Sequence, residues 1–129
     1  MACRLACLLV RLAPDQGEPV GRKAELEQEL KRITEVIVRV YHPERVILFG
    51  SLVGGTVHEW SDIDLAIVKD TSRRFLERAW DVLRLVRPRV GVNVLVYTPQ
   101  EVNHMVASGH YFWVDEIEKK GKVLYDHSS

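Results

Sequence analysis

Hydrophobic side chains along this chain alternate between helical spacing and short continuous runs, a pattern typical of folds that mix helices with strands. Between residues 22 and 41 they recur every three to four positions, at Leu26, Leu30, Ile33, Ile37 and Val40. That spacing predicts an amphipathic helix. Two continuous apolar runs follow, at 46–49 and 65–68, and each has the length of a buried strand. We expect both in the middle of a covered sheet, because strands buried on both faces do not alternate with polar residues.

The next segment predicts a helix and a third strand. Thr71 or Ser72 is the expected cap of the helix. The apolar residues expected together on one side of it are Phe75, Leu76, Ala79, Trp80, Leu83 and Val86. The run 91–97 then predicts the strand, so helices and strands continue to alternate.

The last segment carries clear end signals for helices. Residues 98–101, Thr-Pro-Gln-Glu, have the capping-box pattern with proline at the first helical position. That helix should end near Gly109, and a second one over 111–120 should end at Gly121 before a short final strand. The predicted fold class is therefore α/β, with a mixed central sheet flanked by helices.

The N-terminus differs from the remainder of the chain. A short leucine-rich stretch is followed by residues 14–21, which contain several Pro and Gly residues and should end any helix before them. We expect residues 1–21 to be a flexible extension without an assigned function, and residues 22–129 to form one domain.

Composition narrows the classes of function. The 129 residues contain 18 basic and 18 acidic side chains, so no overall field favours nucleic acid or a membrane surface. No apolar run approaches the length of a transmembrane helix. The two cysteines, Cys3 and Cys7, both lie in the N-terminal extension, which argues against a disulfide-built fold and favours a cytoplasmic location.

Two short motifs carry candidate chemistry. Gly50 and Ser51 follow the first strand, where glycine permits a sharp turn and the serine hydroxyl lies beside free N–H groups that suit phosphate. Asp62 and Asp64 are two residues apart at the start of the second strand, so both carboxylates should point to the same side. Mg²⁺ relieves such repulsion and prefers carboxylates together with substrate phosphates. Gly-Ser turns and solvated Asp pairs are also common singly, and the functional interpretation depends on both occurring together.

Gly50-Ser51, ten further residues and Asp62-x-Asp64 resemble the signature of minimal nucleotidyltransferases of the DNA polymerase beta superfamily. The resemblance covers about residues 22–125. It implies the polymerase-beta-like nucleotidyltransferase fold, a Gly-Ser turn that binds a nucleoside triphosphate, and Mg²⁺ held by Asp62 and Asp64. It also implies transfer of a nucleoside monophosphate, with ATP as the expected donor, to an acceptor.

The third strand departs from this family pattern. Asn93 lies where the family has a third aspartate that completes the metal site and helps to activate the attacking group. An asparagine offers a carbonyl oxygen to a metal, but it has no charge and cannot accept a proton as a base. We therefore count Asn93 among the catalytic positions, together with Asp62 and Asp64, and expect reduced activity.

The length of the chain leaves no room for a separate acceptor-binding domain, so the acceptor is expected in trans. Small proteins with this pattern resemble the antitoxin half of toxin–antitoxin pairs, whose helical HEPN partner is adenylylated on a tyrosine. The competing hypothesis is a catalytically weak or inactive nucleotide- or protein-binding module that neutralises its partner by occlusion.

Six arginines cluster around the second predicted helix, at positions 73, 74, 78, 84, 87 and 89. One or two could reach nucleotide phosphates. A solvated basic helix face, interleaved with acidic residues, is the favoured interpretation.

Overall fold

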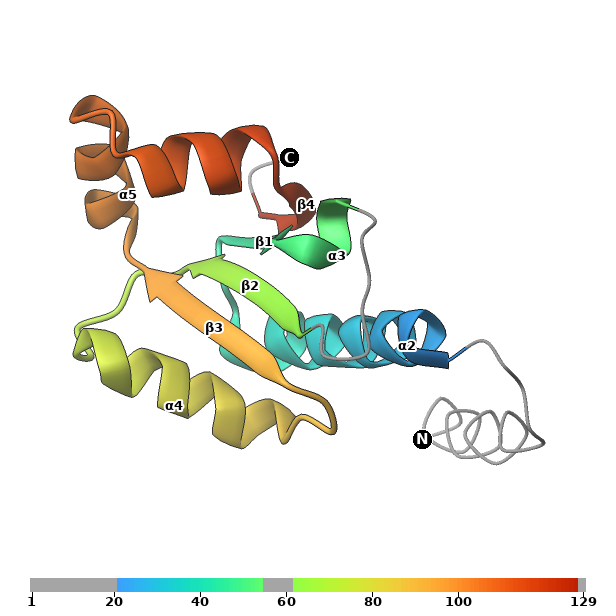
Figure 1. Ribbon diagram of the computed structural model, residues 1–129. Helices are drawn as coiled ribbons and strands as arrows, with labels where there is room; N and C mark the ends of the chain where they lie inside the picture. The colour runs from blue at the N-terminus through green and yellow to red at the C-terminus, as the bar shows by residue number, and fades with distance from the viewer. Residues whose placement is uncertain (1–20, 55–61, 128–129) are drawn as a thin grey trace.

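The computed structural model describes residues 21–54 and 62–127, and these form a mixed four-stranded sheet with helices on both faces (Figure 1). The strand order is β3-β2-β1-β4. The strands span Arg45–Phe49 (β1), Ile63–Val68 (β2), Val92–Tyr97 (β3) and Lys122–Asp126 (β4). β1 pairs with β2 and β4 in antiparallel fashion, whereas β2 and β3 are parallel. The predicted α/β class with a mixed sheet is confirmed, and the two continuous apolar runs form the two central strands.

Helices from both halves of the chain cover one face of the sheet. They are α2 (Gly21–Val36) with its continuation η2 (Ile37–Tyr41), and α4 (Phe75–Val86). Alternate strand residues point into this layer, including Val46, Leu65 and Val94, and pack with Leu26 and Ile33 of α2. The predicted helix over 22–41 is confirmed, and its last turn has the wider π-helical form.

The opposite face is covered by α5 (Pro99–Ala107) and η3 (Phe112–Lys119), and its core includes Ile47, Ala66, Trp113 and Ile117. The predicted cap of α5 is confirmed. Thr98 Oγ1 accepts a hydrogen bond of 3.1 Å from the Glu101 N–H, and the Glu101 carboxylate accepts one of 2.9 Å from the Thr98 N–H. This reciprocal pairing satisfies two N–H groups at the helix start and fixes where α5 leaves β3.

The start and the orientation of α4 differ from the prediction. Its N-cap is Arg74, whereas the Thr71 hydroxyl accepts a hydrogen bond from the Arg73 N–H in the preceding turn. Leu76 and Trp80, expected beside the buried residues, are 73% and 61% exposed.

Arg78 explains the rotation of α4, because its side chain is buried along with Val82 and Val86 on the face that meets the sheet. Arg78 Nη1 donates to the Val96 carbonyl at 3.1 Å and to Glu101 Oε1 at 2.8 Å, and Nε donates to the Arg73 carbonyl. A buried guanidinium needs such partners. These contacts make Arg78 a structural residue that links α4 to β3 and α5.

Residues 1–20 of the predicted N-terminal extension and residues 55–61 between the two motifs lie outside the described residues, whereas Gly21 already begins α2. A four-residue helix, α3 (Ser51–Gly54), follows β1 and fits the expectation that Gly54 and Gly55 keep this helix short. Across the described ranges, we find no helix of the length and apolarity needed to cross a membrane.

Candidate functional site

Three residues on adjacent strands lie in one row across the sheet. Phe49 on β1 is opposite Asp64 on β2, and Asp64 is in register with Asn93 on β3. Since side chains alternate along a strand, these three residues share the face that α5 and η3 cover further along the sheet. Asp64 is half-buried and Asn93 is exposed. The row thus presents a carboxylate and an amide side by side at one end of the sheet.

A hydrogen bond of 2.8 Å joins the amide and the carboxylate, from Asn93 Nδ2 to Asp64 Oδ1. Burial raises the pKa of Asp64, the hydrogen bond from Asn93 lowers it, and the negative charge of Asp62 raises it again. The net shift is upward, so the site disfavours the ionised form of Asp64. A cation bound between the two aspartates would remove that penalty.

Gly50 is required at the end of β1 on two grounds. Its φ is +83°, a conformation that residues with a Cβ adopt only at a cost. A Cβ built on it would also overlap the Asp64 carboxylate. The turn backbone therefore lies directly against Asp64, and α3 begins at the next residue, Ser51. The glycine turn and the aspartate strand, which are separate in the sequence, are thus in direct contact in the fold.

Gly91 plays the same part for Asp62 and was missed from the sequence. A Cβ on Gly91 would overlap the Asp62 carboxylate, and the Gly91 carbonyl accepts a hydrogen bond of 3.0 Å from the Ile63 N–H. Each aspartate is therefore packed on the backbone of a glycine from a neighbouring segment. A glycine at the entrance of β3, beside Asn93, is the only signal of this contact in the sequence.

The donor set fits one hard divalent cation better than a cluster of them. Two carboxylates and one amide oxygen are ligands that suit Mg²⁺, which keeps the rest of its shell for water and phosphate. Asn93 could turn its amide so that the oxygen faces the cation instead of donating to Asp64. Within residues 21–54 and 62–127, there is no group of three or more His, Cys, Asp or Glu side chains placed to hold a metal.

The structure describes four of the five predicted site residues in full. Gly50, Asp62, Asp64 and Asn93 converge at the same end of the sheet. The side chain of Ser51 lies outside what the structure describes, and its role stays a prediction. Of the arginines considered for phosphate binding, Arg78 is committed to the fold through its bonds to Val96 and Glu101.

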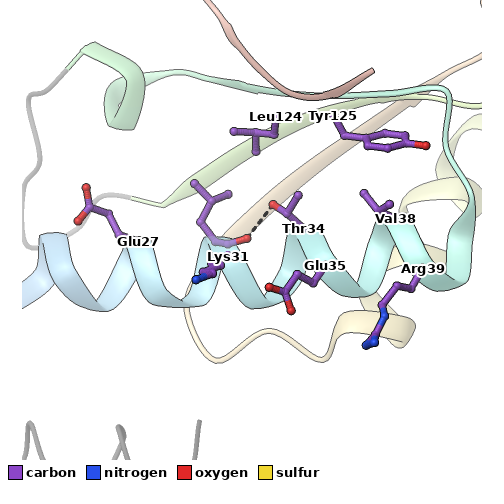
Figure 2. A pocket seen from close by; sticks show the side chains of 9 residues that line it. Glu27, Lys31, Thr34, Glu35, Val38, Arg39, Leu124 and Tyr125 are labelled. Carbon is purple, nitrogen blue, oxygen red and sulfur yellow. Dashed lines mark hydrogen bonds between the residues drawn. The ribbon is translucent and has the colours of Figure 1, made fainter. Parts of the chain in front are cut away.

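A groove of about 590 Å³ lies elsewhere, between α2 and the edge strand β4 (Figure 2). Leu30 and Val38 contribute apolar walls, and Leu124 and Tyr125 lie across from the helix. The Thr34 hydroxyl in it donates to the Leu30 carbonyl at 2.7 Å and is therefore already bonded. None of the converging site residues lines this groove, and its charged side chains alternate in sign along α2 instead of forming a reactive pair. We do not assign the chemistry to it.

Comparison with known proteins shows the family and a similar fold. The family model described as "Polymerase beta, Nucleotidyltransferase" matches residues 28–129. Among solved structures, the crystal structure of a "putative nucleotidyltransferase" from Sulfolobus solfataricus, at 1.40 Å resolution, is similar with a TM-score of 0.53. The two chains are 20% identical, and the match covers 88% of this chain and 96% of that one. The comparison with curated proteins gives no match.

Proposed function

Because the chain belongs to the polymerase beta nucleotidyltransferase family, we propose that it is a Mg²⁺-dependent enzyme that transfers AMP from ATP to an acceptor in trans. The observation that carries the proposal is the convergence of Gly50, Asp62 and Asp64 at one end of the sheet. Two partly buried like charges, Asp64 against Gly50 and Asp62 against Gly91, are costly unless a cation and its phosphate ligand complete the site. The spacing of the motif in the sequence does not by itself show that these residues lie together.

The residues divide the work of binding the triphosphate. Asp62 and Asp64 would hold Mg²⁺, which when bound would neutralise charge that develops on the phosphates. Gly50 lets the turn backbone approach the ligand closely, and Ser51 begins the helical turn beside it. These groups would orient the α-phosphorus for in-line attack by the acceptor hydroxyl.

The proposed reaction forms a bond from an acceptor hydroxyl oxygen to the α-phosphorus and breaks the bond from that phosphorus to the bridging oxygen of the leaving pyrophosphate. The hydroxyl proton must leave as the new bond forms. Asn93 cannot accept it, since an amide has no basic lone pair at neutral pH. The proton therefore passes to solvent or to a base that the acceptor itself brings. Without such a base on the acceptor, the reaction is slower by about 10²–10⁴-fold, the factor that general-base help contributes.

We further propose that the acceptor is a helical HEPN-type protein and that the pair forms a toxin–antitoxin system. The proposal rests on the Gly-Ser and Asp-x-Asp pattern of the chain. A tyrosine hydroxyl on that partner would be the attacking group.

The Asn93–Asp64 hydrogen bond favours a second candidate function, a binding module without useful catalysis. In that case the neutral amide keeps Asp64 partly compensated without metal, and the chain neutralises its partner by occlusion. Both candidates predict binding between the chain and its partner, but only the first predicts a covalent product.

Purification of the protein from its native host, followed by mass spectrometry of the bound partner, distinguishes the enzyme from the binding module. Incubation of the purified pair with ATP labelled at the α-phosphate or at the γ-phosphate follows as a second step. Mg²⁺-dependent transfer of the α label alone, lost in Asp64→Asn, is the expected result. Stable association with no labelled product, in wild type at saturating Mg²⁺, would favour the occlusion module.

A further inference from the structure

The solvent-facing side of α4 carries two large hydrophobic residues that the fold does not use. Leu76 is 73% exposed and Trp80 is 61% exposed, and they are one helical turn apart. Neither belongs to the hydrophobic clusters formed by the described residues, whereas Ala79 and Leu83 of the same helix pack against the core. An exposed tryptophan beside an exposed leucine is the kind of surface that proteins use for contact with partners.

One other exposed apolar residue of this helix, Phe75, is explained by the fold. The Phe75 ring lies 5.4 Å from the Tyr97 ring, and the Arg78 guanidinium lies 5.8 Å from the Phe75 ring, so Phe75 seals the edge of the core. Trp113, by contrast with Trp80, is fully buried. Leu85 of α4 is also 39% exposed and belongs to neither cluster, but Leu76 and Trp80 are the most exposed apolar residues of this helix.

The same side of α4 is basic. Arg84 is one turn beyond Trp80, and Arg87 follows it at the end of the helix. Arg73 is neutralised by Asp81, with Nε 2.9 Å from Oδ2, and by Glu77. Among the described residues, no ion pair involves Arg84 or Arg87. Leu76, Trp80, Arg84 and Arg87 thus form one stripe, here called the α4 stripe, that is apolar at its start and positive at its end.

We propose that the α4 stripe is the docking surface for an amphipathic helix of a partner protein, with apolar residues against Leu76 and Trp80 and carboxylates against Arg84 and Arg87. Tryptophan and arginine are the residues that most often dominate binding energy in interfaces, and both occur here in one line. A helix in such a position would use spacing of three to four residues to match the stripe.

Two other occupants fit the α4 stripe less well. In a second copy of this chain packed antiparallel about Trp80, Arg84 would lie opposite Leu76, so Arg84 would gain no carboxylate partner. A nucleic acid would leave Leu76 without an apolar partner. A helix with acidic residues at only one end supplies both partners.

The position of the stripe connects it to the candidate site. Four residues after Arg87 the chain reaches Gly91, which lies against Asp62. Figure 1 shows α4 along the edge of the sheet, ending near the start of β3. The positive end of the α4 stripe therefore lies toward the end of the sheet where Asp62, Asp64 and Asn93 converge, although Asp64 and Asn93 are on the opposite face of the sheet. The inference itself does not depend on nucleotide transfer, because no residue of the stripe belongs to that site.

The test measures binding to defined probes by fluorescence anisotropy. The probes are a labelled stapled helix with leucines on one face and glutamates at one end, the same helix with lysines instead, and a single-stranded RNA of mixed sequence. The glutamate helix should bind saturably. Trp80→Ala should weaken that binding by about 10-fold or more, as expected for a central hot spot. The double variant Arg84→Glu/Arg87→Glu should lose the glutamate helix and gain the lysine helix.

Val106→Ala on α5 is the matched control, because Val106 is also exposed but lies on the other face of the sheet. It should bind the glutamate helix like wild type, and so should Asp62→Asn/Asp64→Asn, which separates this proposal from the catalytic one. Thermal melting of each variant checks that it folds. Equal binding of both helices, binding of none, tighter binding of RNA, or self-association in sedimentation that Trp80→Ala abolishes would each overturn the proposal.

Discussion

Asn93 Nδ2 donates a hydrogen bond of 2.8 Å to Asp64 Oδ1 across the parallel pair β2 and β3. The amide therefore performs part of the work of a cation, since it lowers the pKa of a carboxylate that burial and Asp62 raise. The same bond keeps the Asn93 side chain beside the position where a metal would bind. This hydrogen bond explains how the two aspartates can remain close together in the protein without a metal. The predictions for Asp64 and Asn93 follow from it.

Replacing Asp64 with asparagine should stabilise the metal-free protein at neutral pH. The pKa of Asp64 is raised in the folded state, so the folded protein binds that proton more tightly than the unfolded chain does. Its contribution to stability is then lost as pH rises through the interval between the two pKa values. Because Asp64 is partly exposed, we expect a modest gain in Tm of about 2 °C, which corresponds to roughly 0.5 kcal/mol. The gain should disappear at low pH, where wild-type Asp64 is protonated.

Thermal melting across pH, with and without Mg²⁺, measures this effect. Asp70→Asn is the matched control, since Asp70 lies beyond the opposite end of β2. Mg²⁺ should raise the Tm of wild type and of the control but not of Asp64→Asn. A lower Tm for Asp64→Asn at pH 7 would contradict the idea that the charge is uncompensated in the free site.

Asn93→Asp should increase nucleotide transfer and lower stability without metal. The change removes the amide donor and places a third negative charge beside Asp64, which costs stability until Mg²⁺ binds. It also supplies a proton acceptor, so transfer should increase by up to about 10²–10⁴-fold. The assay follows label from the α-phosphate of ATP into the partner, together with Tm, during a Mg²⁺ titration. Asn103→Asp, at an exposed position on α5, is the control. Unchanged or reduced transfer by a folded, Mg²⁺-saturated Asn93→Asp protein would show that Asn93 does not limit the reaction.

Gly50→Ala should abolish metal-dependent nucleotide binding, because the new Cβ would overlap the Asp64 carboxylate. Gly109→Ala is the matched control. Gly109 also has a positive φ, +69°, but its Cβ would meet nothing within 4 Å. Both variants should lose about 1–2 kcal/mol of stability from backbone strain. Only Gly50→Ala should lose Mg²⁺-dependent ATP affinity, and equal affinities in the two variants would separate the Gly50 turn from the site.

Arg78→Ala should destabilise the domain by about 1–3 kcal/mol, because it removes the bond to the Val96 carbonyl and breaks an ion pair whose Glu101 side chain is 41% exposed. The side chain bonds to the Val96 carbonyl and to Glu101, so its loss uncouples α4 from β3 and α5. Chemical denaturation gives the free energy of unfolding directly. Arg74→Ala, an exposed neighbour, should change that free energy by less than about 0.5 kcal/mol. A similar small change in Arg78→Ala would refute the structural role.

The sequence predicted those features that depend on local signals. The strands and the cap of α5 follow from short apolar runs and from Thr98 and Glu101, and both are present as expected. The rotation of α4 could not be predicted in this way, because it depends on Arg78 meeting a carbonyl and a carboxylate that lie far along the chain. The contact of Gly91 with Asp62 is likewise non-local and has no periodic signal. The convergence of Gly50 and Asp64 required the pairing of β1 with β2, which the motif spacing alone could only indicate.

The central claim is that Asp62 and Asp64 hold the cation through which this chain binds a nucleoside triphosphate. Isothermal titration calorimetry of ATP into wild type and into Asp62→Asn/Asp64→Asn, each with and without Mg²⁺, tests it most directly. We expect Mg²⁺ to strengthen ATP binding to wild type by about 10-fold or more and to have no effect on ATP binding to the double variant. Identical Mg²⁺-dependent affinities in the two proteins, with both shown to be folded, would contradict it.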